Sequence, residues 1–315
     1  MHYTIITSEV QGERSIPQSF LSWAFEGRSN KWLYAVGFVF LIVMMHYGAA
    51  LFFLPITLLG DYTTWPPAVA SLAAMLVLLP MILIPFLWVW LVHKRPWWSI
   101  VVPKPRIEAW NFGMGILAAL IVAIVSWTYF TVVLGVPISF GAPHWATYLP
   151  VFLIAIPKVF MQTTAEEIIF RGYGMQAVRT FTANPVAIVV VTAFAFALPH
   201  YPNVLMNDWP WWGLINFALP ALLFGWMVLR TGSLWMPMGW HWFNNFSLGQ
   251  IIEVNNGTAS GPAAGTAIMF SDGRPSLGQQ TGITIVCYVL IALLINYLVG
   301  RREASLGDRD SQPAT

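Results

Sequence analysis

The chain has 315 residues, of which 57% are hydrophobic and only 9% are charged, and its mean hydropathy is +0.67. An ordinary soluble domain has about a quarter charged residues. The charged side chains, 15 Lys or Arg and 13 Asp or Glu, are too few to cover a water-facing surface. Composition therefore excludes a soluble globular protein and predicts an integral membrane protein. A net charge of +2 gives no support for nucleic-acid binding, and a single cysteine, Cys287, excludes a disulfide framework.

Apolar stretches of about 20 residues are long enough to cross the hydrocarbon core as helices, the form in which lipid tolerates a backbone. Eight such stretches predict an all-α fold, a polytopic membrane protein with about eight transmembrane helices in one bundle. Their expected limits are 33–59, 68–92, 112–135, 149–179, 186–200, 211–229, 234–252 and 281–299. The fourth and the seventh stretches carry most of the polar residues within the spans.

Cationic residues predict the orientation, because Lys and Arg are enriched on the cytoplasmic side of a membrane. Thirteen of the 15 lie in the two tails or in alternate connections, namely Arg14, Arg28, Lys31, Lys94, Arg95, Lys104, Arg106, Arg171, Arg179, Arg230, Arg301, Arg302 and Arg309. We therefore expect a multi-pass protein of a bacterial inner membrane with both termini in the cytoplasm. The expected organisation is a polar tail over 1–30, one transmembrane domain over 31–300 and a second tail over 301–315. The long connection 253–280, rich in Gly and Asn, is expected to be irregular.

Two adjacent acids, Glu166 and Glu167, lie within the fourth stretch. A carboxylate at the centre of a membrane helix costs about 2.5 to 3.5 kcal/mol on insertion scales, so each needs compensation. Glu167 and Arg171 are four residues apart and share a helix face, which predicts a salt bridge. Glu166 points about 100° away and has no such cationic partner one turn along. Glu167 is therefore expected to be structural and Glu166 to be free for chemistry.

The fifth stretch ends at His200, and the turn before this stretch is expected at Asn184 and Pro185. At helical rise Glu166 lies roughly 27 Å before this turn and His200 roughly 24 Å after it. The two side chains should therefore lie at similar depth. This match requires the fourth helix to continue past Gly172 to about residue 181.

His241 and Asn245, in the seventh stretch, are four residues apart and project from one helix face. His241 is expected to lie at a shallower depth than Glu166. A carboxylate and an imidazole can together remove a proton from water, and an imidazole and an amide can hold the oxyanion formed at a peptide carbonyl. Hydrolysis is therefore the chemistry that these residues favour. His46, isolated in the first stretch, is expected to make only a packing hydrogen bond.

Three motifs resemble those of a known family. Residues 166–171 (EEIIFR) match EExxxR, Phe196 to His200 (FALPH) match FxxxH, and His241 to Asn245 (HWFNN) match HxxxN. Over about 149–249 the chain resembles the CPBP intramembrane proteases, which include the type II CAAX prenyl endopeptidases and bacterial Abi proteins. The family's eight-span fold agrees with the count above.

The resemblance implies a role for each motif residue. Glu166 and His200 would activate the water, and His241 with Asn245 would form the oxyanion pocket. Glu167 would be an auxiliary carboxylate, with Arg171 and Phe196 as structural support. A glutamate mechanism without metal is preferred because it explains Asn245. Zinc is the alternative, with Glu166, His200 and His241 as ligands and Glu167 as base.

The predicted function is therefore an intramembrane endopeptidase that acts in contact with membrane lipid. Its expected substrates are peptides or proteins, with C-terminal CAAX-like, prenylated peptides or other membrane peptides as candidates. Two alternatives stay open at this point: a non-catalytic scaffold or bacteriocin-immunity protein, and a proton-coupled transporter.

Overall fold

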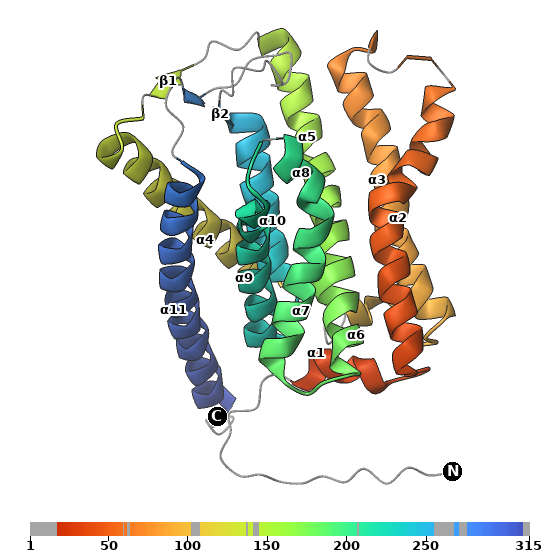
Figure 1. Cartoon of the computed structure of the whole chain (residues 1–315). Helices are drawn as coiled ribbons and strands as arrows, with labels where there is room; N and C mark the ends of the chain where they lie inside the picture. Colours follow the sequence, from red (N-terminus) through yellow and green to blue (C-terminus); the bar gives the residue numbers. More distant parts are fainter. Residues whose placement is uncertain are drawn as a thin grey trace, which may run out of the picture.

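The computed structural model describes residues 18–58, 60–61, 64–101, 108–136, 138–140, 145–206, 208–254, 268–270 and 276–310. These residues form the predicted all-α bundle, which is confirmed (Figure 1). The α-helices are α1 (Gln18–Ser22), α2 (Lys31–Thr57), α3 (Pro67–Leu91), α4 (Ala109–Thr128), α5 (Trp145–Glu167), α6 (Met175–Arg179), α7 (Pro185–Ala197), α8 (Tyr201–Met206), α9 (Ile215–Thr231), α10 (Trp235–Phe246) and α11 (Leu277–Asp310). The 3-10 helices are η1 (Trp23–Phe25), η3 (Trp97–Ile100), η6 (Leu198–His200) and η7 (Trp211–Leu214), and the π-helices are η4 (Tyr129–Val133), η5 (Ile168–Gly174) and η8 (Ser247–Ile251).

Seven helical segments of the described chain are long and apolar enough to cross a membrane. They are Lys31–Thr57, Pro67–Leu91, Ala109–Val133, Tyr148–Arg179, Pro185–Met206, Trp211–Thr231 and Leu277–Arg302. The eighth predicted crossing, over 234–252, is shorter, because α10 has 12 residues and η8 adds five. α10 starts well inside the bundle, since the turn before it packs on the chain after η3, where the Leu234 amide donates to the Val101 carbonyl at 3.1 Å.

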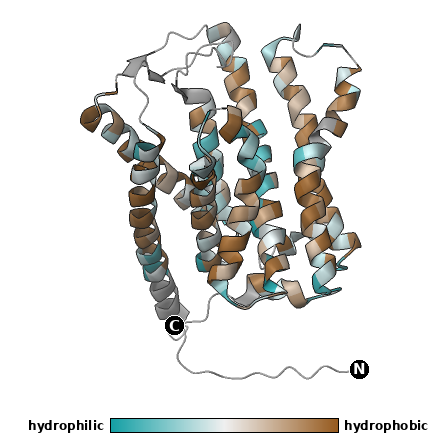
Figure 2. Ribbon diagram, viewed as in Figure 1, coloured by the Kyte–Doolittle hydropathy of each residue, from teal (hydrophilic) through white to brown (hydrophobic). Residues whose placement is uncertain are grey.

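The outer faces of the bundle are hydrophobic. Large side chains such as Leu51, Leu76 and Leu293 are about two-thirds exposed, and α2, α3 and α11 are largely hydrophobic over most of their length (Figure 2). In water these faces would be unstable, whereas lipid covers them at no cost. The protein is therefore a multi-pass membrane protein.

The helices alternate in direction, so that α1 and the last turns of α11 lie at the same end of the bundle (Figure 1). The helix ends and turns at this end carry many cations, and we call it the basic end. By their elements and contacts its cations are Arg28, Lys31, Lys94, Arg95, Arg179, Arg230, Arg301 and Arg302. This grouping agrees with the charge pattern of the sequence. That the basic end faces the cytoplasm stays a prediction.

The turn between the fourth and fifth predicted spans is confirmed. Asn184 is the N-cap of α7, and its side-chain oxygen accepts from the amides of Val186 at 2.9 Å and Ala187 at 3.3 Å. Pro185 occupies the first helical position, where its missing N–H costs nothing. The helix before this turn runs on past Gly172 through η5 and α6, as the depth estimate required.

α4 and α10 cross at very short range through two glycines. A Cβ atom on Gly115 would lie 2.1 Å from the Met236 carbonyl oxygen, and one on Gly239 would lie 2.2 Å from that of Phe112. No other residue fits at either place, because the backbones themselves are in contact. This crossing fixes α10, and with it His241, against the rest of the bundle.

A small sheet caps the end opposite the basic end, where the sequence predicted irregular structure. Its strands are β1 (Ile138–Phe140), β2 (Ile252–Val254) and β3 (Ile268–Phe270), in the order β1-β3-β2. β3 pairs antiparallel with β1 and parallel with β2. The expectation for 253–280 is therefore wrong at β2, β3 and the start of α11, and its residues 255–267 and 271–275 lie outside the described residues. Three-residue strands between Gly-rich stretches give too little alternation to be recognised.

Candidate active site

A π-helix carries part of the EExxxR motif. α5 ends at Glu167, and the next seven residues, Ile168–Gly174, form η5 with every residue buried. π-helical turns are rare in proteins, and many of those that do occur lie at functional sites. The fourth helix continues through this wider turn to Arg179. Gly172 and Gly174 therefore do not end the helix, and their role is to allow close packing. A Cβ atom on Gly172 would lie only 2.3 Å from the Ile100 carbonyl oxygen.

The predicted salt bridge between Glu167 and Arg171 is confirmed. The Arg171 Nη1 atom lies 2.9 Å from Glu167 Oε1, and the two side chains are 1% and 0% exposed. The same oxygen accepts a second hydrogen bond from His241 Nδ1 at 2.7 Å. Arg171, which the sequence placed among the cytoplasmic cations, is therefore a buried residue of the bundle interior. Glu167 is the common acceptor for a guanidinium and an imidazole.

Two aromatic rings stabilise the charge of the Arg171 guanidinium, of which only Nη1 is hydrogen-bonded to Glu167. Within the described residues, Nε and Nη2 of Arg171 have no hydrogen-bond partner. The guanidinium carbon instead lies 4.5 Å from the ring centre of Phe196 and 5.1 Å from that of Phe224. Desolvated cation–π contacts of this kind contribute up to about 2 kcal/mol each. Phe196 is thus placed as a support for Arg171.

Glu166 approaches the opposite nitrogen of the same imidazole. Its Oε2 atom lies 3.6 Å from His241 Nε2, and its Oε1 atom lies 3.4 Å from Gln162 Nε2. Its side chain is 12% exposed, against 0% for Glu167. The sequence expected no cationic partner for Glu166 one turn along its own helix, and the imidazole that approaches it comes instead from α10. A separation of 3.6 Å is longer than a hydrogen bond.

His241 reaches both acids because α10 begins deep in the bundle. The side chain of Leu234, just before α10, lies 3.3 Å from where a Cβ atom of Gly172 would be. From this common level Glu166 is six residues away and His241 is seven, a rise of about 9 to 11 Å on either helix. The expectation that His241 is shallower than Glu166 is therefore wrong.

His200 lies beside this cluster with one nitrogen already engaged. Its Nδ1 atom donates to the Phe196 carbonyl at 2.8 Å, which leaves Nε2 as the acceptor nitrogen. Its ring stacks on Phe217 at 4.6 Å and meets the edge of the His46 ring at 6.4 Å. His200 also interacts electrostatically with Glu166 and His241.

His46 makes the hydrogen bond expected of a packing residue, from Nδ1 to the Ile42 carbonyl at 3.0 Å. Its contact with the His200 ring was not expected. α2 thereby borders the cluster at His200.

Asn245 lies four residues after His241 in α10 and therefore on the same face. Its Oδ1 atom accepts a hydrogen bond from Asn244 Nδ2 at 3.2 Å. The Nδ2 atom of Asn245 is thus the end that can donate to a substrate oxygen.

The alternative zinc site does not fit the geometry. Among the described residues no group of three or more His, Cys, Asp and Glu side chains is arranged to hold a metal ion, and this includes Glu166, His200 and His241.

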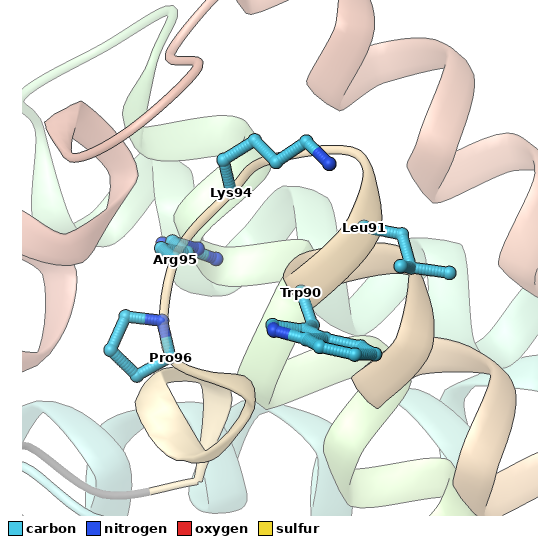
Figure 3. Close-up of a pocket in the computed structure, with 5 residues that line it drawn as sticks. All are labelled: Trp90, Leu91, Lys94, Arg95 and Pro96. Carbon is cyan, nitrogen blue, oxygen red and sulfur yellow. The ribbon is translucent and has the colours of Figure 1, made fainter.

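A pocket of about 460 Å³ lies elsewhere, at the turn after α3 (Figure 3). Its lining residues are Trp90, Leu91, Lys94, Arg95 and Pro96. It contains none of the predicted site residues, so it is separate from the acid and imidazole cluster.

Fold and cluster together define a multi-pass helical membrane protein with acids and imidazoles buried between its spans. Residues 148–247, about a third of the chain, match the family model described as "Type II CAAX prenyl endopeptidase Rce1-like". The predicted resemblance is confirmed over this segment, which contains all three motifs, and the matched family is one of membrane peptidases.

A curated relative extends the similarity beyond that segment. It is "Uncharacterized protein YyaK" of Bacillus subtilis (strain 168), 26% identical over 190 residues. The alignment covers 55% of this chain and 59% of the relative, so the chain spans less than two thirds of that protein.

Two aromatic residues of the cluster were missed from the sequence. Phe224 lies against both Arg171 and His241, with its ring 5.4 Å from the imidazole, and Phe217 stacks on His200. Both belong to an apolar spanning helix, in which a phenylalanine carries no signal that separates a ring facing the site from one facing lipid.

Proposed function

We propose that this protein is an intramembrane endopeptidase that hydrolyses a peptide bond of a membrane peptide or protein. The observation that carries the proposal is the shared imidazole: His241 lies between Glu167 at 2.7 Å and Glu166 at 3.6 Å inside a lipid-facing bundle. The match of residues 148–247 to the Rce1-like family supports the same reaction class.

Charge balance supports a definite protonation state for the cluster. Two ionised glutamates, the Arg171 guanidinium and a doubly protonated His241 sum to zero net charge. A neutral sum is what a buried site requires, because an uncompensated charge costs several kcal/mol. In this state Nδ1–H of His241 is held by Glu167 and Nε2–H remains a donor.

The reaction then divides between two pairs of residues. The carboxylate of Glu166, assisted by Nε2 of His200, accepts a proton from water while the water oxygen bonds to the peptide carbonyl carbon. The carbonyl oxygen becomes an oxyanion, which Nε2–H of His241 and the amide of Asn245 stabilise. The accepted proton passes to the leaving nitrogen, the C–N bond breaks, and an acid and an amine are released.

The supporting residues hold this arrangement. Glu167 accepts the Nδ1–H of His241 and so fixes the direction of the imidazolium and compensates its charge, as the aspartate does in a serine-protease triad. Arg171 neutralises Glu167, and the Phe196 ring supports Arg171. The scheme needs no metal ion for any of its steps.

Candidate substrates are peptides whose scissile bond lies within or near the membrane. The matched family points to C-terminal CAAX-like peptides with a prenylated cysteine, and other membrane peptides are the second class to test. Such substrates can approach from the bilayer, where the protein's own exposed faces are apolar.

Purified protein in liposomes provides the test, with prenylated and unprenylated peptides as substrates and mass spectrometry to identify products. Three variants should each fold as the parent does and fail to cleave a peptide that the parent cleaves: Glu166→Gln, His200→Gln and His241→Gln. Full activity in all three variants would refute the assignment. If Glu166→Gln abolishes cleavage yet complements a deletion phenotype, the protein's role in the cell is that of a scaffold.

A further inference from the structure

A second buried polar cluster lies at the basic end, outside the proposed active site. It brings together Tyr34 of α2, His93 and Arg95 of the turn after α3, Tyr173 of η5 and Gln176 of α6. Arg95 is 4% exposed and the other four side chains are fully buried. Three of these residues precede 148, so they lie outside the segment that matches the Rce1-like family.

The hydrogen bonds of His93 form a chain whose direction is fixed by chemistry. Trp88 Nε1 can only donate, and it lies 3.1 Å from the Tyr173 hydroxyl oxygen. The Arg28 carbonyl can only accept, and it lies 2.9 Å from His93 Nδ1. Nε2 of His93 must therefore accept from the Tyr173 hydroxyl, at 2.8 Å. Burial lowers the pKa of His93 to about 4, which agrees with this neutral tautomer.

A second arm joins the same turn to the N-terminal helices. Arg95 donates through Nη1 to the Trp23 carbonyl and through Nη2 to Gln176 Oε1 at 2.6 Å. Gln176 Nε2 donates to the carbonyls of Phe20 at 3.2 Å and Ser99 at 2.9 Å. α1, η1 and η3 are thus tied to the helix that follows η5.

The conformation of the turn itself favours this arrangement (Figure 3). Lys94 has a left-handed backbone, with φ of 58°, and its side chain is exposed. Its neighbours His93 and Arg95 are both buried. The left-handed backbone at Lys94 therefore lets the side chains on either side of it, His93 and Arg95, both point inward while the Lys94 side chain points outward.

The hydroxyl of Tyr173 packs tightly against α2. A Cβ atom on Gly37 would lie 2.2 Å from that oxygen, so the backbone of α2 contacts it directly. Tyr173 follows Arg171 by two residues and Glu167 by six within a single helical segment. Any displacement of Tyr173 therefore moves the backbone that holds the salt bridge against His241.

We propose that Tyr173 and His93 are positioning residues of the peptidase site: their hydrogen bond locks η5 at the height where Glu167 meets His241. The inference rests on the proposed function where it is tested by kcat, but not where it is tested by hydrogen exchange of the η5 amides. If Tyr173 and His93 act in this way, the N-terminal segment and the turn after α3 help to set the geometry of the active site.

Tyr173→Phe tests the inference, because it removes one oxygen and keeps the ring. We expect kcat to fall about tenfold with KM within about twofold, since misplacement of catalytic groups by less than 1 Å has effects of this size. The matched control is Tyr34→Phe. The Tyr34 hydroxyl has no hydrogen-bond partner in the described part of the chain, although its ring stacks on His93 at 4.1 Å. This control should keep the parent's kcat.

His93 provides the rescue experiment. His93→Gln retains an oxygen acceptor for the Tyr173 hydroxyl, whereas His93→Leu does not. The first variant should keep most of the parent's kcat, and the second should match Tyr173→Phe. Because the two residues act through one bond, the double variant His93→Leu/Tyr173→Phe should be no slower than either single change.

Hydrogen exchange of the amides of 168–174 gives a readout that needs no substrate. Faster exchange in Tyr173→Phe than in Tyr34→Phe, together with the lower kcat, supports the inference. Unchanged exchange, or an unchanged kcat, overturns it. If Tyr173→Phe does not fold, the His93→Gln and His93→Leu pair decides by the same two readouts. If the parent cleaves no peptide, the proposed function fails while exchange still decides whether the bond orders η5.

Discussion

Glu167→Gln should destabilise the protein by about 3 to 5 kcal/mol and abolish cleavage, because it leaves Arg171 as an uncompensated buried charge. The two side chains are 1% and 0% exposed and their atoms lie 2.9 Å apart, so water cannot replace the lost carboxylate. His241 also loses the charged acceptor of its Nδ1 proton. Thermal unfolding in detergent, followed by circular dichroism, measures the stability loss.

Two further variants separate structure from chemistry. Glu167→Gln/Arg171→Met removes both charges, so its stability should return to within about 2 kcal/mol of the parent while activity stays absent. Glu166→Gln, at the 12% exposed neighbour, should abolish cleavage with little change in unfolding temperature. If Glu167→Gln is as stable as the parent, or if Glu167→Gln/Arg171→Met is less stable than Glu167→Gln alone, Glu167 does not serve to compensate Arg171.

Three other outcomes follow from the structure. Gly172→Ala places a Cβ atom 2.3 Å from the Ile100 carbonyl oxygen and should cost about 2 kcal/mol in denaturation, whereas Gly113→Ala, with open space around it, should be neutral or slightly stabilising; equal effects would refute the close contact. Between pH 6.5 and 4 the unfolded chain binds a proton at His93 and the folded chain does not, so the free energy of unfolding should fall as pH falls, by about 3 kcal/mol in full, and His93→Gln should remove this dependence. Chelation with 1,10-phenanthroline should leave peptide cleavage unchanged, and loss of activity restored by added zinc would show that a metal is needed.

Local contacts were predictable from the sequence because helical spacing fixes them. The Glu167 and Arg171 pair and the Asn184 cap each depend on residues within four positions along the chain. The bundle itself followed from hydrophobic length, since lipid leaves helices as the available form for such stretches.

Contacts between helices were not predictable in the same way. His241 meets Glu166 and Glu167 because α10 begins level with Gly172, and that level depends on how the turn at Leu234 packs on Val101. Spacing along one helix carries no information about this offset. The estimate from helical rise therefore placed His241 too near the basic end.

The π-helix was also missed, for a different reason. Ile168–Gly174 has the composition of an ordinary apolar helix that contains two glycines, and nothing in that composition distinguishes a π-helical turn from an α-helical one. The glycines themselves allow the approach of Ile100 and Phe38, which are distant in sequence.

The glycine contacts between α4 and α10 restrict how a substrate could reach the cluster. Main chains that touch at Gly115 and Gly239 cannot slide or roll past each other without collision, so these two helices behave as one rigid wall. Movement that opens a passage from the bilayer must then take place along another seam. The border between α2 and η6, where the rings of His46 and His200 meet edge to face, is made by side chains and not by main chains in contact.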